Sequence, residues 1–248
     1  ATVEQKAQNR LEELCKSITL ALPHEFRTPL NGIISSSELL IQDFAQMDHA
    51  EVMDMLTTIH SSAKRLHRLI QNFLLYSELT ASTPERIEAQ QRSSTGSNSK
   101  AIITMIAQQK ADQFNRPDDL HLNLVDAIVH ISDVKLTKIL EELLDNAFKF
   151  SEPETPVQVV TKLYNDKLLA LYVIDKGRGM TAEQISRLGA YMQFERDLYE
   201  QQGAGLGLMI VKRLAEIHGG SLTLDSIPNQ QTTVCVTLRL QEQDSIST

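Results

Sequence analysis

The first third of this chain reads as two long helices with no strand between them, which restricts how it can fold. From about Val3 to Leu79 no strand-like alternation occurs, and the only glycine is Gly32. Apolar residues recur at steps of three and four, as they do along one face of a helix. They are Leu11, Leu14, Ile18, Leu22, Phe26, Leu30, Ile33 and Ile34, then Val52, Met55, Leu56, Ile59, Ala63, Leu66, Leu69, Ile70, Phe73 and Leu74.

The segment between these two sets, Asp43 to His49, is predicted to be the turn of a helical hairpin. Each helix carries one apolar stripe, and a single hairpin cannot bury both stripes. Pairing two hairpins into a four-helix bundle is the simplest solution, so we expect a homodimer. The alternative is a hairpin that docks on the second half of its own chain.

A polar segment separates the helical region from a region of mixed pattern. Residues 81–99 are polar and end in a run of serine, threonine, glycine and asparagine, which is typical of a linker. We therefore expect a helical domain over residues 1–80, the linker over 81–99, a second domain over 100–241 and a tail over 242–248.

In the second domain, helical and strand-like patterns occur in separate runs. This arrangement predicts an α+β fold, an α/β sandwich in which helices cover one face of a mixed sheet. The expected helices are Ala101–Phe114, a helix capped by Ser132 and ending at Phe150, and Leu206–His218. The expected strands are His121–Val125, Val157–Tyr164, Leu168–Ile174, Ser221–Asp225 and Thr232–Leu240.

Charge and composition exclude several classes of protein. The formal net charge is −8, which disfavours contact with a phosphate backbone, so we expect no nucleic-acid partner. No apolar run approaches the about 20 residues of a membrane span, and no signal-peptide pattern is present. We expect a cytoplasmic location, although the chain begins inside a helical pattern and missing upstream sequence could attach a longer protein to a membrane. Cys15 and Cys235 are too far apart for a recognisable metal or disulfide spacing and are expected to be buried.

His24 lies in the most distinctive block of the helical region, LPHEFRTPL at residues 22–30. Phosphorylation of a histidine needs an exposed neutral imidazole near a carboxylate, and Glu25 supplies that carboxylate. Leu22 and Phe26 belong to the apolar stripe, so His24 is expected off the buried face. Thr28 lies one turn further on the same face, where its hydroxyl could position a water molecule. For the other histidines, we expect structural or solvated roles: His49, His60, His67, His121, His130 and His218.

A second block, ELLDNAFKF at residues 142–150, places Glu142, Asn146 and Lys149 on one helical face. Amide or carboxylate oxygens there could hold Mg²⁺ against a triphosphate, because this ion prefers oxygen ligands. Lys149 could contact a phosphate, and Phe150 could lie against a base.

Two glycine-containing blocks follow. In DKGRGM at residues 175–180, Asp175 follows a predicted strand that ends at Ile174, and its carboxylate suits the amino group of adenine. Gly177 and Gly179 would let the backbone turn close to the ring. In GAGLGL at residues 203–208, glycine-rich backbone precedes a helix, as at many phosphate sites. Residues 181–202 between them have the length of a movable lid, with Tyr191 and Phe194 as apolar anchors.

These blocks, in this order, resemble the H, N, G1, F and G2 boxes of two-component sensor histidine kinases, over nearly the whole chain. The resemblance implies a dimerisation and histidine-phosphotransfer domain, then an ATP-binding domain of the Bergerat type shared with gyrase, the Hsp90 chaperone and MutL. It also implies ATP and Mg²⁺ as cofactors, and as partner the receiver domain of a response regulator. The implied activity is autophosphorylation of His24 by ATP, followed by transfer to an aspartate of that receiver.

The resemblance also assigns roles to residues. His24 matches the phosphoacceptor, Glu25 its acid/base and Thr28 the position that aids dephosphorylation of a response regulator. In the nucleotide site, the matching residues are Asn146 for Mg²⁺, Lys149 for phosphate, Phe150 beside the base, Asp175 for adenine, Gly177, Gly179, Gly203, Gly205 and Gly207 in the glycine boxes, and Phe194 in the F box.

This chain departs from the family pattern at three places. Pro23 replaces the small polar residue usual before the histidine, and the stretch Tyr191–Phe194 lacks the proline common in the F box. Glu142 stands where many members have a second asparagine. It could serve Mg²⁺ or a water network, or it could polarise a water for slow ATP hydrolysis, as a glutamate does in the related ATPases.

Other activities are also compatible with parts of this pattern. A regulatory scaffold could bind receivers without forming phosphohistidine, although the complete set of nucleotide blocks argues against it. A phosphatase of phosphorylated receivers, using Glu25 and Thr28, could coexist with kinase activity. A stand-alone Bergerat ATPase would leave the hairpin that carries His24 unexplained.

Overall fold

The computed structural model describes residues 25–83, 85, 87, 96–185 and 205–241. These residues divide into two compact units, a helical hairpin that ends at Ala81 and a domain that begins at Ser82. None of the helices in these ranges has the length and apolar character that a membrane span requires.

The hairpin consists of a helix over residues 25–43 and α2, His49–Ala81. The predicted turn is confirmed: the amides of Gln46 and Met47 both donate to the carbonyl of Asp43. A capping box begins α2, because the Glu51 amide donates to the Asp48 carboxylate and the Asp48 amide to that of Glu51.

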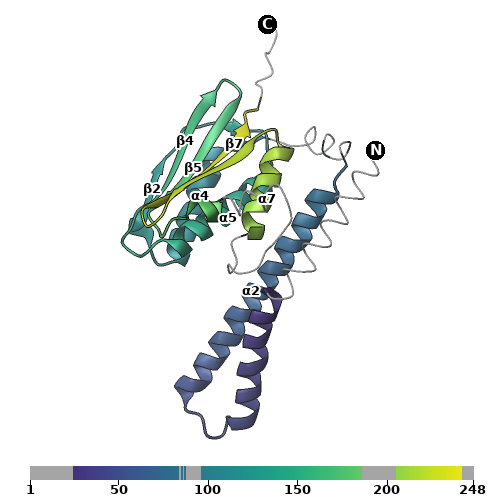
Figure 1. The fold of residues 1–248 in the computed structure, drawn as a ribbon, viewed down its shortest axis with the longest axis vertical. Coiled ribbons are helices and arrows are strands. Elements are labelled where there is room, and N and C mark those ends of the chain that lie inside the picture. The colour runs from purple at the N-terminus through teal and green to yellow at the C-terminus, as the bar shows by residue number, and fades with distance from the viewer. Residues whose placement is uncertain (1–24, 84, 86, 88–95, 186–204, 242–248) are drawn as a thin grey trace. The chain divides into compact units, whose positions relative to one another are not determined.

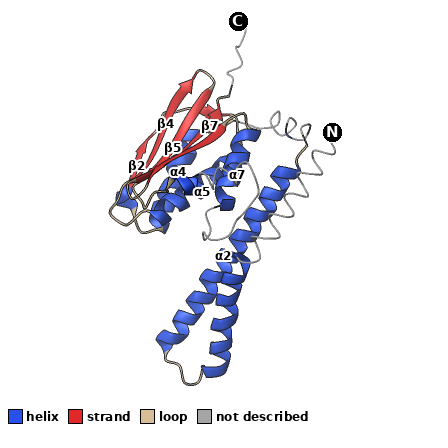
Figure 2. Ribbon diagram, viewed as in Figure 1, coloured by secondary structure: helices blue, strands red, loops and turns tan. Residues whose placement is uncertain are grey.

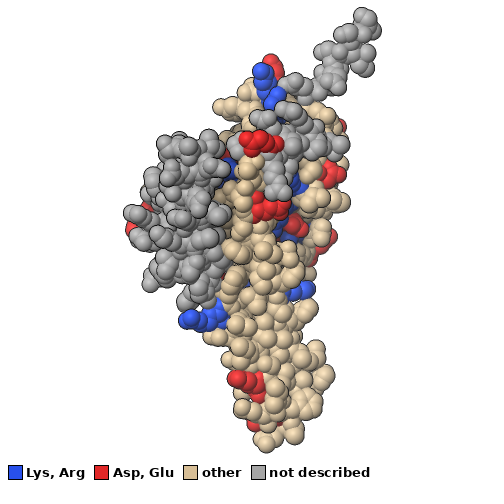
Figure 3. Space-filling view, turned by 90° about the vertical axis from the view of Figure 1, so that its right-hand side faces the viewer, with Lys and Arg blue, Asp and Glu red and all other residues tan. Residues whose placement is uncertain are grey.

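The two helices approach closely at Gly32, where an added Cβ would lie 2.7 Å from the Ser62 Oγ. Many large apolar side chains of the hairpin are nevertheless exposed in the single chain, Ile41 by 82%. Its surface in Figure 3 is largely uncharged toward the turn, at the lower end of the picture. The other exposed apolar residues are Leu30, Ile34, Leu39, Phe44, Met53, Leu56, Ile70 and Leu74.

A five-stranded mixed sheet forms the second unit, in the order β2-β4-β5-β7-β6. The strands β2 and β4 are parallel, and every other neighbouring pair is antiparallel. The bounds are β2 Leu120–Asn123, β4 Val157–Asn165, β5 Leu168–Asp175, β6 Ser221–Ile227 and β7 Gln231–Arg239.

Three helices cover one face of this sheet, as predicted (Figures 1 and 2): α4 Ser99–Gln113, α5 Asp133–Phe150 and α7 Gly205–Ile217. Alternate residues of β7 are buried, which is the pattern of a strand with one covered face. The covered face meets an apolar stripe of α5 that includes Leu136, Leu140 and Leu144.

The structure differs from the sequence-based expectations in three details. Ser97–Asn98 (β1) pairs with Ile128–Val129 (β3) as a second small sheet, so the end of the predicted linker belongs to the folded domain. Ser132 is the N-cap residue of α5, but its side chain makes no capping hydrogen bond. Cys235 is only half-buried, because it lies on the sheet face opposite the helices, and the expectation of a buried thiol was wrong.

Candidate functional site

Helix α5 contacts both of the glycine-containing turns that the sequence singled out. Near its middle, Glu142 is only 2% exposed and its Oε1 lies 2.8 Å from the Lys138 Nζ. Its other carboxylate oxygen faces the first turn of α7, where a Cβ added at Gly207 would lie 2.3 Å away. Gly207 therefore lets α7 approach the buried carboxylate.

The last residue of α5 contacts the other turn. The Arg178 amide donates to the Phe150 carbonyl at 3.2 Å. A Cβ at Gly177 would lie 2.1 Å from the same carbonyl oxygen, so only glycine fits without a backbone shift. Blocks far apart in the sequence thus meet along one helix.

Asp175 ends β5 beside this turn and is 7% exposed. Burial raises the pKa of its carboxyl to about 6, because the charged form loses hydration. The Gly177 amide donates to Asp175 Oδ1 at 3.0 Å and acts in the opposite direction on the pKa. Asp175 is therefore a buried hydrogen-bond acceptor. One of its carboxylate oxygens accepts from the Gly177 amide, and this amide does not donate to the other.

The turn after Asp175 is anchored to the β6–β7 hairpin. Gly179 has φ of 60°, and a Cβ there would lie 2.2 Å from the Ile227 carbonyl oxygen. The Asn229 amide donates to the Arg178 carbonyl at 2.7 Å, and the Met180 amide donates to Ser226 Oγ at 2.9 Å. These contacts fix the turn from the side opposite α5.

Two cations lie near the Phe150 ring. The Arg178 Cζ is 4.5 Å from its centroid and the Lys149 Nζ is 5.1 Å from it. Both distances are within the range of cation–π attraction. A role was predicted for Lys149 from the sequence and none for Arg178, whose only indication was its place between Gly177 and Gly179.

Along α5 the predicted face runs from the core to the surface: Glu142 is buried, Asn146 half-buried and Lys149 exposed. The described residues contain no group of three or more His, Cys, Asp or Glu side chains able to hold a metal ion. A half-buried amide oxygen fits Mg²⁺ that is held mainly by phosphate and water oxygens, so Asn146 suits such a site.

Several predicted site residues lie outside the described residues, namely His24, Tyr191, Phe194 and Gly203. Glu25 is half-buried and Thr28 is exposed on the helix over residues 25–43. Thr181 and Gln184 form a reciprocal cap on a helix that begins at residue 182, within the predicted lid.

Of the six histidines expected to have no catalytic role, His218 is buried. Its Nδ1 lies 2.8 Å from the Leu214 carbonyl oxygen, and burial lowers its pKa to about 4, so it is neutral at pH 7. Its bonded, buried environment agrees with the expected structural role.

Comparison with known proteins places two family models on this chain. Residues 16–82 match the His Kinase A phospho-acceptor domain, and residues 132–242 match the ATPase family described as histidine kinase-, DNA gyrase B- and HSP90-like. The two matches lie in the order predicted from the sequence, with the phospho-acceptor domain first.

The chain is 28% identical, over 88% of its length, to an uncharacterized sensor-like histidine kinase of Rhizobium meliloti, of which it covers 41%. It is also 28% identical, over 95% of its length, to the circadian input-output histidine kinase CikA of Synechococcus elongatus, of which it covers 33%. The chain thus spans less than half the length of these relatives.

Among solved structures, the fold is similar to the histidine kinase AdeS of Acinetobacter baumannii. The TM-score is 0.60 at 18% identity, covering 88% of this chain and 98% of that one. It is also similar to full-length ShkA, solved in complex with AMPPNP, with a TM-score of 0.58 at 21% identity, covering 94% of this chain and 47% of ShkA.

Proposed function

We infer the activity of this chain from its membership of the two-component histidine kinases, whose phospho-acceptor and ATP-binding domains it carries in that order. We propose that it transfers the γ-phosphoryl group of ATP to its own His24, and from there to an aspartate in the receiver domain of a response regulator.

One observation carries this proposal: α5 contacts the Gly177–Arg178 turn through the Phe150 carbonyl and the first turn of α7 through Glu142. An adenine acceptor at one turn and helix N-terminal amides at the other are what the two ends of ATP require. In this proposal Asp175 accepts from the adenine amino group, and Phe150 lies beside the base. Lys149, Gly203, Gly205 and Gly207 contact the phosphates.

In the transfer step, an imidazole nitrogen of His24 attacks the γ-phosphorus, and the bond to the β-γ bridging oxygen breaks, so ADP leaves. Glu25 accepts the imidazole proton. Asn146 would hold Mg²⁺, with Glu142 as its neighbour on the same face, and the bound ion would neutralise charge on the triphosphate. The main task of the protein is positioning. In the second step an aspartate carboxylate of the receiver attacks the phosphorus and His24 is regenerated.

The exposed apolar side chains of the hairpin support a homodimer. Side chains such as Leu30, Ile34, Leu56 and Leu74 are exposed in the single chain, and a second hairpin offers a matching apolar surface that would remove them from water. Sedimentation of the purified chain tests this part of the proposal, and a monomer at micromolar concentration would contradict it.

The proposal extends to dephosphorylation of the receiver. Thr28 is exposed, as a hydroxyl that orients a hydrolytic water must be. Thr28→Ala should slow the loss of phosphate from a phosphorylated receiver, whereas Thr28→Ser should retain it. Equal rates for Thr28→Ala and wild type would exclude this role.

Incubation of the chain with Mg²⁺ and ATP labelled at the γ-phosphate tests the kinase assignment. We expect label that is stable in base and labile in acid, because phosphohistidine has this stability and phosphoserine does not. A chain that binds ATP yet stays unlabelled would favour the scaffold alternative instead.

Gly177→Ala is expected to weaken ATP binding by about tenfold or more, because its Cβ collides with the Phe150 carbonyl and displaces the turn beside Asp175. The control is Gly219→Ala. Unlike Gly177, Gly219 is at positive φ (74°), but the nearest atom to an added Cβ lies 3.8 Å away. The control should lose about 1 kcal/mol of stability and keep its ATP affinity. Equal affinities for the two variants, measured by calorimetric titration, would contradict the site.

Asp175→Asn is expected to change stability and binding in opposite directions. Because the folded pKa is raised from 3.8 to about 6, the wild-type carboxyl favours folding below pH 4 and loses this contribution as the pH rises through 6. The variant should therefore gain up to about 3 kcal/mol at pH 7.5 and nothing near pH 4. ATP should bind about tenfold more weakly or worse, because a hydrogen bond to a charged acceptor is replaced by a neutral one. Thermal melts at the two pH values and an ATP titration give both numbers.

A further inference from the structure

Arg116 is a buried cation next to the nucleotide site that has no role in the scheme above. It follows α4 in a Schellman motif: Asn115 has φ of 55°, its amide donates to Asp112, and the Arg116 amide donates to Ala111. This turn brings Arg116 to the C-terminal end of α5, where it is 8% exposed.

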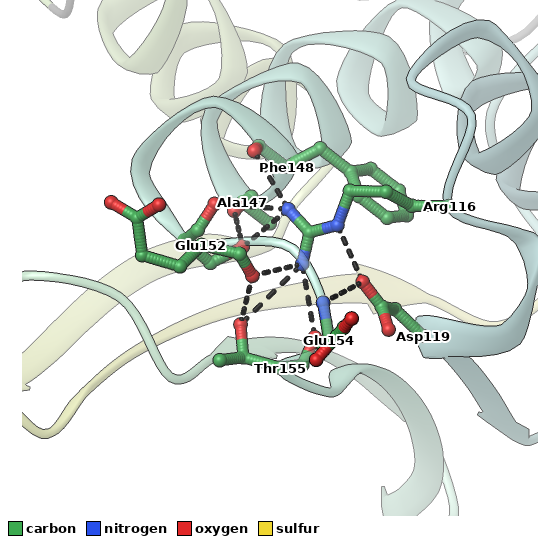
Figure 4. Close-up of polar contacts among 8 residues, drawn as sticks. Arg116, Asp119, Ala147, Phe148, Glu152, Glu154 and Thr155 are labelled. Carbon is green, nitrogen blue, oxygen red and sulfur yellow. Dashed lines mark hydrogen bonds and ion pairs between the residues drawn. The ribbon is translucent and has the colours of Figure 1, made fainter.

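The guanidinium is surrounded by backbone carbonyls (Figure 4). Its Nη1 donates to the carbonyls of Phe148 at 3.0 Å and Ser151 at 2.9 Å. Its Nη2 donates to those of Glu152 at 2.7 Å and Thr155 at 3.0 Å. The Nε donates to the Asp119 carboxylate at 2.5 Å.

The last carbonyls of a helix have no partner within the helix and carry partial negative charge. A planar guanidinium offers five N–H donors in a fixed fork, so one side chain can serve several of these carbonyls at once. Arg116 also stacks on the Phe148 ring, with its Cζ 5.2 Å from the centroid. The end of α5 and the turn over residues 151–155 are therefore fixed by one side chain.

The same end of α5 forms one wall of the nucleotide site. Lys149 and Phe150 follow Phe148 directly, and the Phe150 carbonyl accepts the Arg178 amide of the turn beside Asp175. A displacement of this carbonyl moves the turn with it, because the Gly177 Cα has no free space on that side.

We propose that Arg116 is a positioning residue of the nucleotide site. By holding the C-terminal end of α5, Arg116 fixes the positions of Lys149, Phe150 and the Gly177–Arg178 turn. This inference rests on the proposed function, since it assumes that ATP binds between these elements.

The test uses the full chain, with Arg116→Lys, Asp119→Asn and the core variant Leu238→Ala as a stability control. Leu238 is buried in β7, and its cross-strand neighbour is Leu169 of β5. We measure the Kd for ATP well below the melting temperature and the hydrogen exchange of the Arg178 amide.

A lysine keeps the charge but cannot reproduce the fork, so Arg116→Lys should raise the Kd for ATP about tenfold and speed Arg178 exchange. Asp119→Asn weakens the charged anchor of the guanidinium and the acceptor of the Glu154 amide but keeps the Arg116 fork. It should change both quantities in the same direction by a smaller factor. Leu238→Ala should lower the melting temperature and leave the Kd within about twofold, since a merely structural loss reduces stability and not the affinity of the folded protein.

Wild-type Kd and Arg178 exchange in Arg116→Lys would overturn the inference while leaving ATP binding itself intact. If Arg116→Lys does not fold, Asp119→Asn decides: an unchanged Kd and unchanged exchange in that variant overturn the inference. A wild-type chain that does not bind ATP overturns both this inference and the proposed function.

Discussion

His24→Ala is expected to abolish transfer of labelled phosphate from ATP to the chain while leaving the affinity for ATP unchanged. The imidazole nitrogen is the nucleophile of the first step, and alanine has no atom that can replace it. The nucleotide is held by residues of the second unit, so its binding does not depend on this side chain. The readouts are label on the intact chain and the Kd from calorimetric titration.

The matched control is His67→Ala, which removes an exposed histidine from α2. Both variants remove an imidazole, so a general effect of histidine removal would affect both. The control should label like wild type. Label that persists in His24→Ala would contradict the assignment of His24 as the phosphoacceptor. Loss of label in both variants would show that the effect is not specific to His24.

Lys110→Met is expected to destabilise the ATP-binding domain by about 3–5 kcal/mol. The Lys110 Nζ lies 2.9 Å from the Asp145 Oδ1, and both residues are 8% exposed. Methionine fills the space of the lysine stem but takes the Lys110 charge away from a buried carboxylate. Because Asp145 immediately precedes Asn146 on α5, ATP affinity should fall as well.

Lys100→Met on the same helix is the control, since Lys100 is exposed, and it should change stability by less than about 0.5 kcal/mol. Lys110→Met/Asp145→Leu removes both charges and should recover most of the loss. Urea unfolding of the full chain, with hydrogen exchange of α5 to assign the transition, measures these differences. If Lys110→Met is as stable as Lys100→Met, the Lys110–Asp145 ion pair contributes little to the stability of the domain.

The regular elements around the site could be predicted from the sequence because each has a clear period. The apolar spacing of α5 continues to Phe150, where the helix ends as predicted. The strand predicted over residues 168–174 is β5, which continues one residue further to Asp175. The small sheet of β1 and β3 could not be predicted, because strands of two residues have no alternation and Ser97 lies in a turn-like stretch.

The contacts that hold the site together could not be predicted either. Arg116 bonds mostly to backbone carbonyls, which every residue has, so no side-chain pattern marks its partners. Lys110 and Asp145 pair across two helices, and sequence spacing does not define which faces of two helices meet. The end of α4 was predicted at Phe114, and the turn that directs Arg116 inward follows that residue.

The central claim is that α5 forms a shared wall between an adenine site at Asp175 and a phosphate site at the start of α7. A crystal structure of the chain with a non-hydrolysable ATP analogue tests it most directly. We expect the adenine amino nitrogen within hydrogen-bonding distance of the Asp175 carboxylate and the phosphates at the first turn of α7 beside Gly207. An analogue bound with its base away from Asp175, or with its phosphates away from α7, would contradict the account.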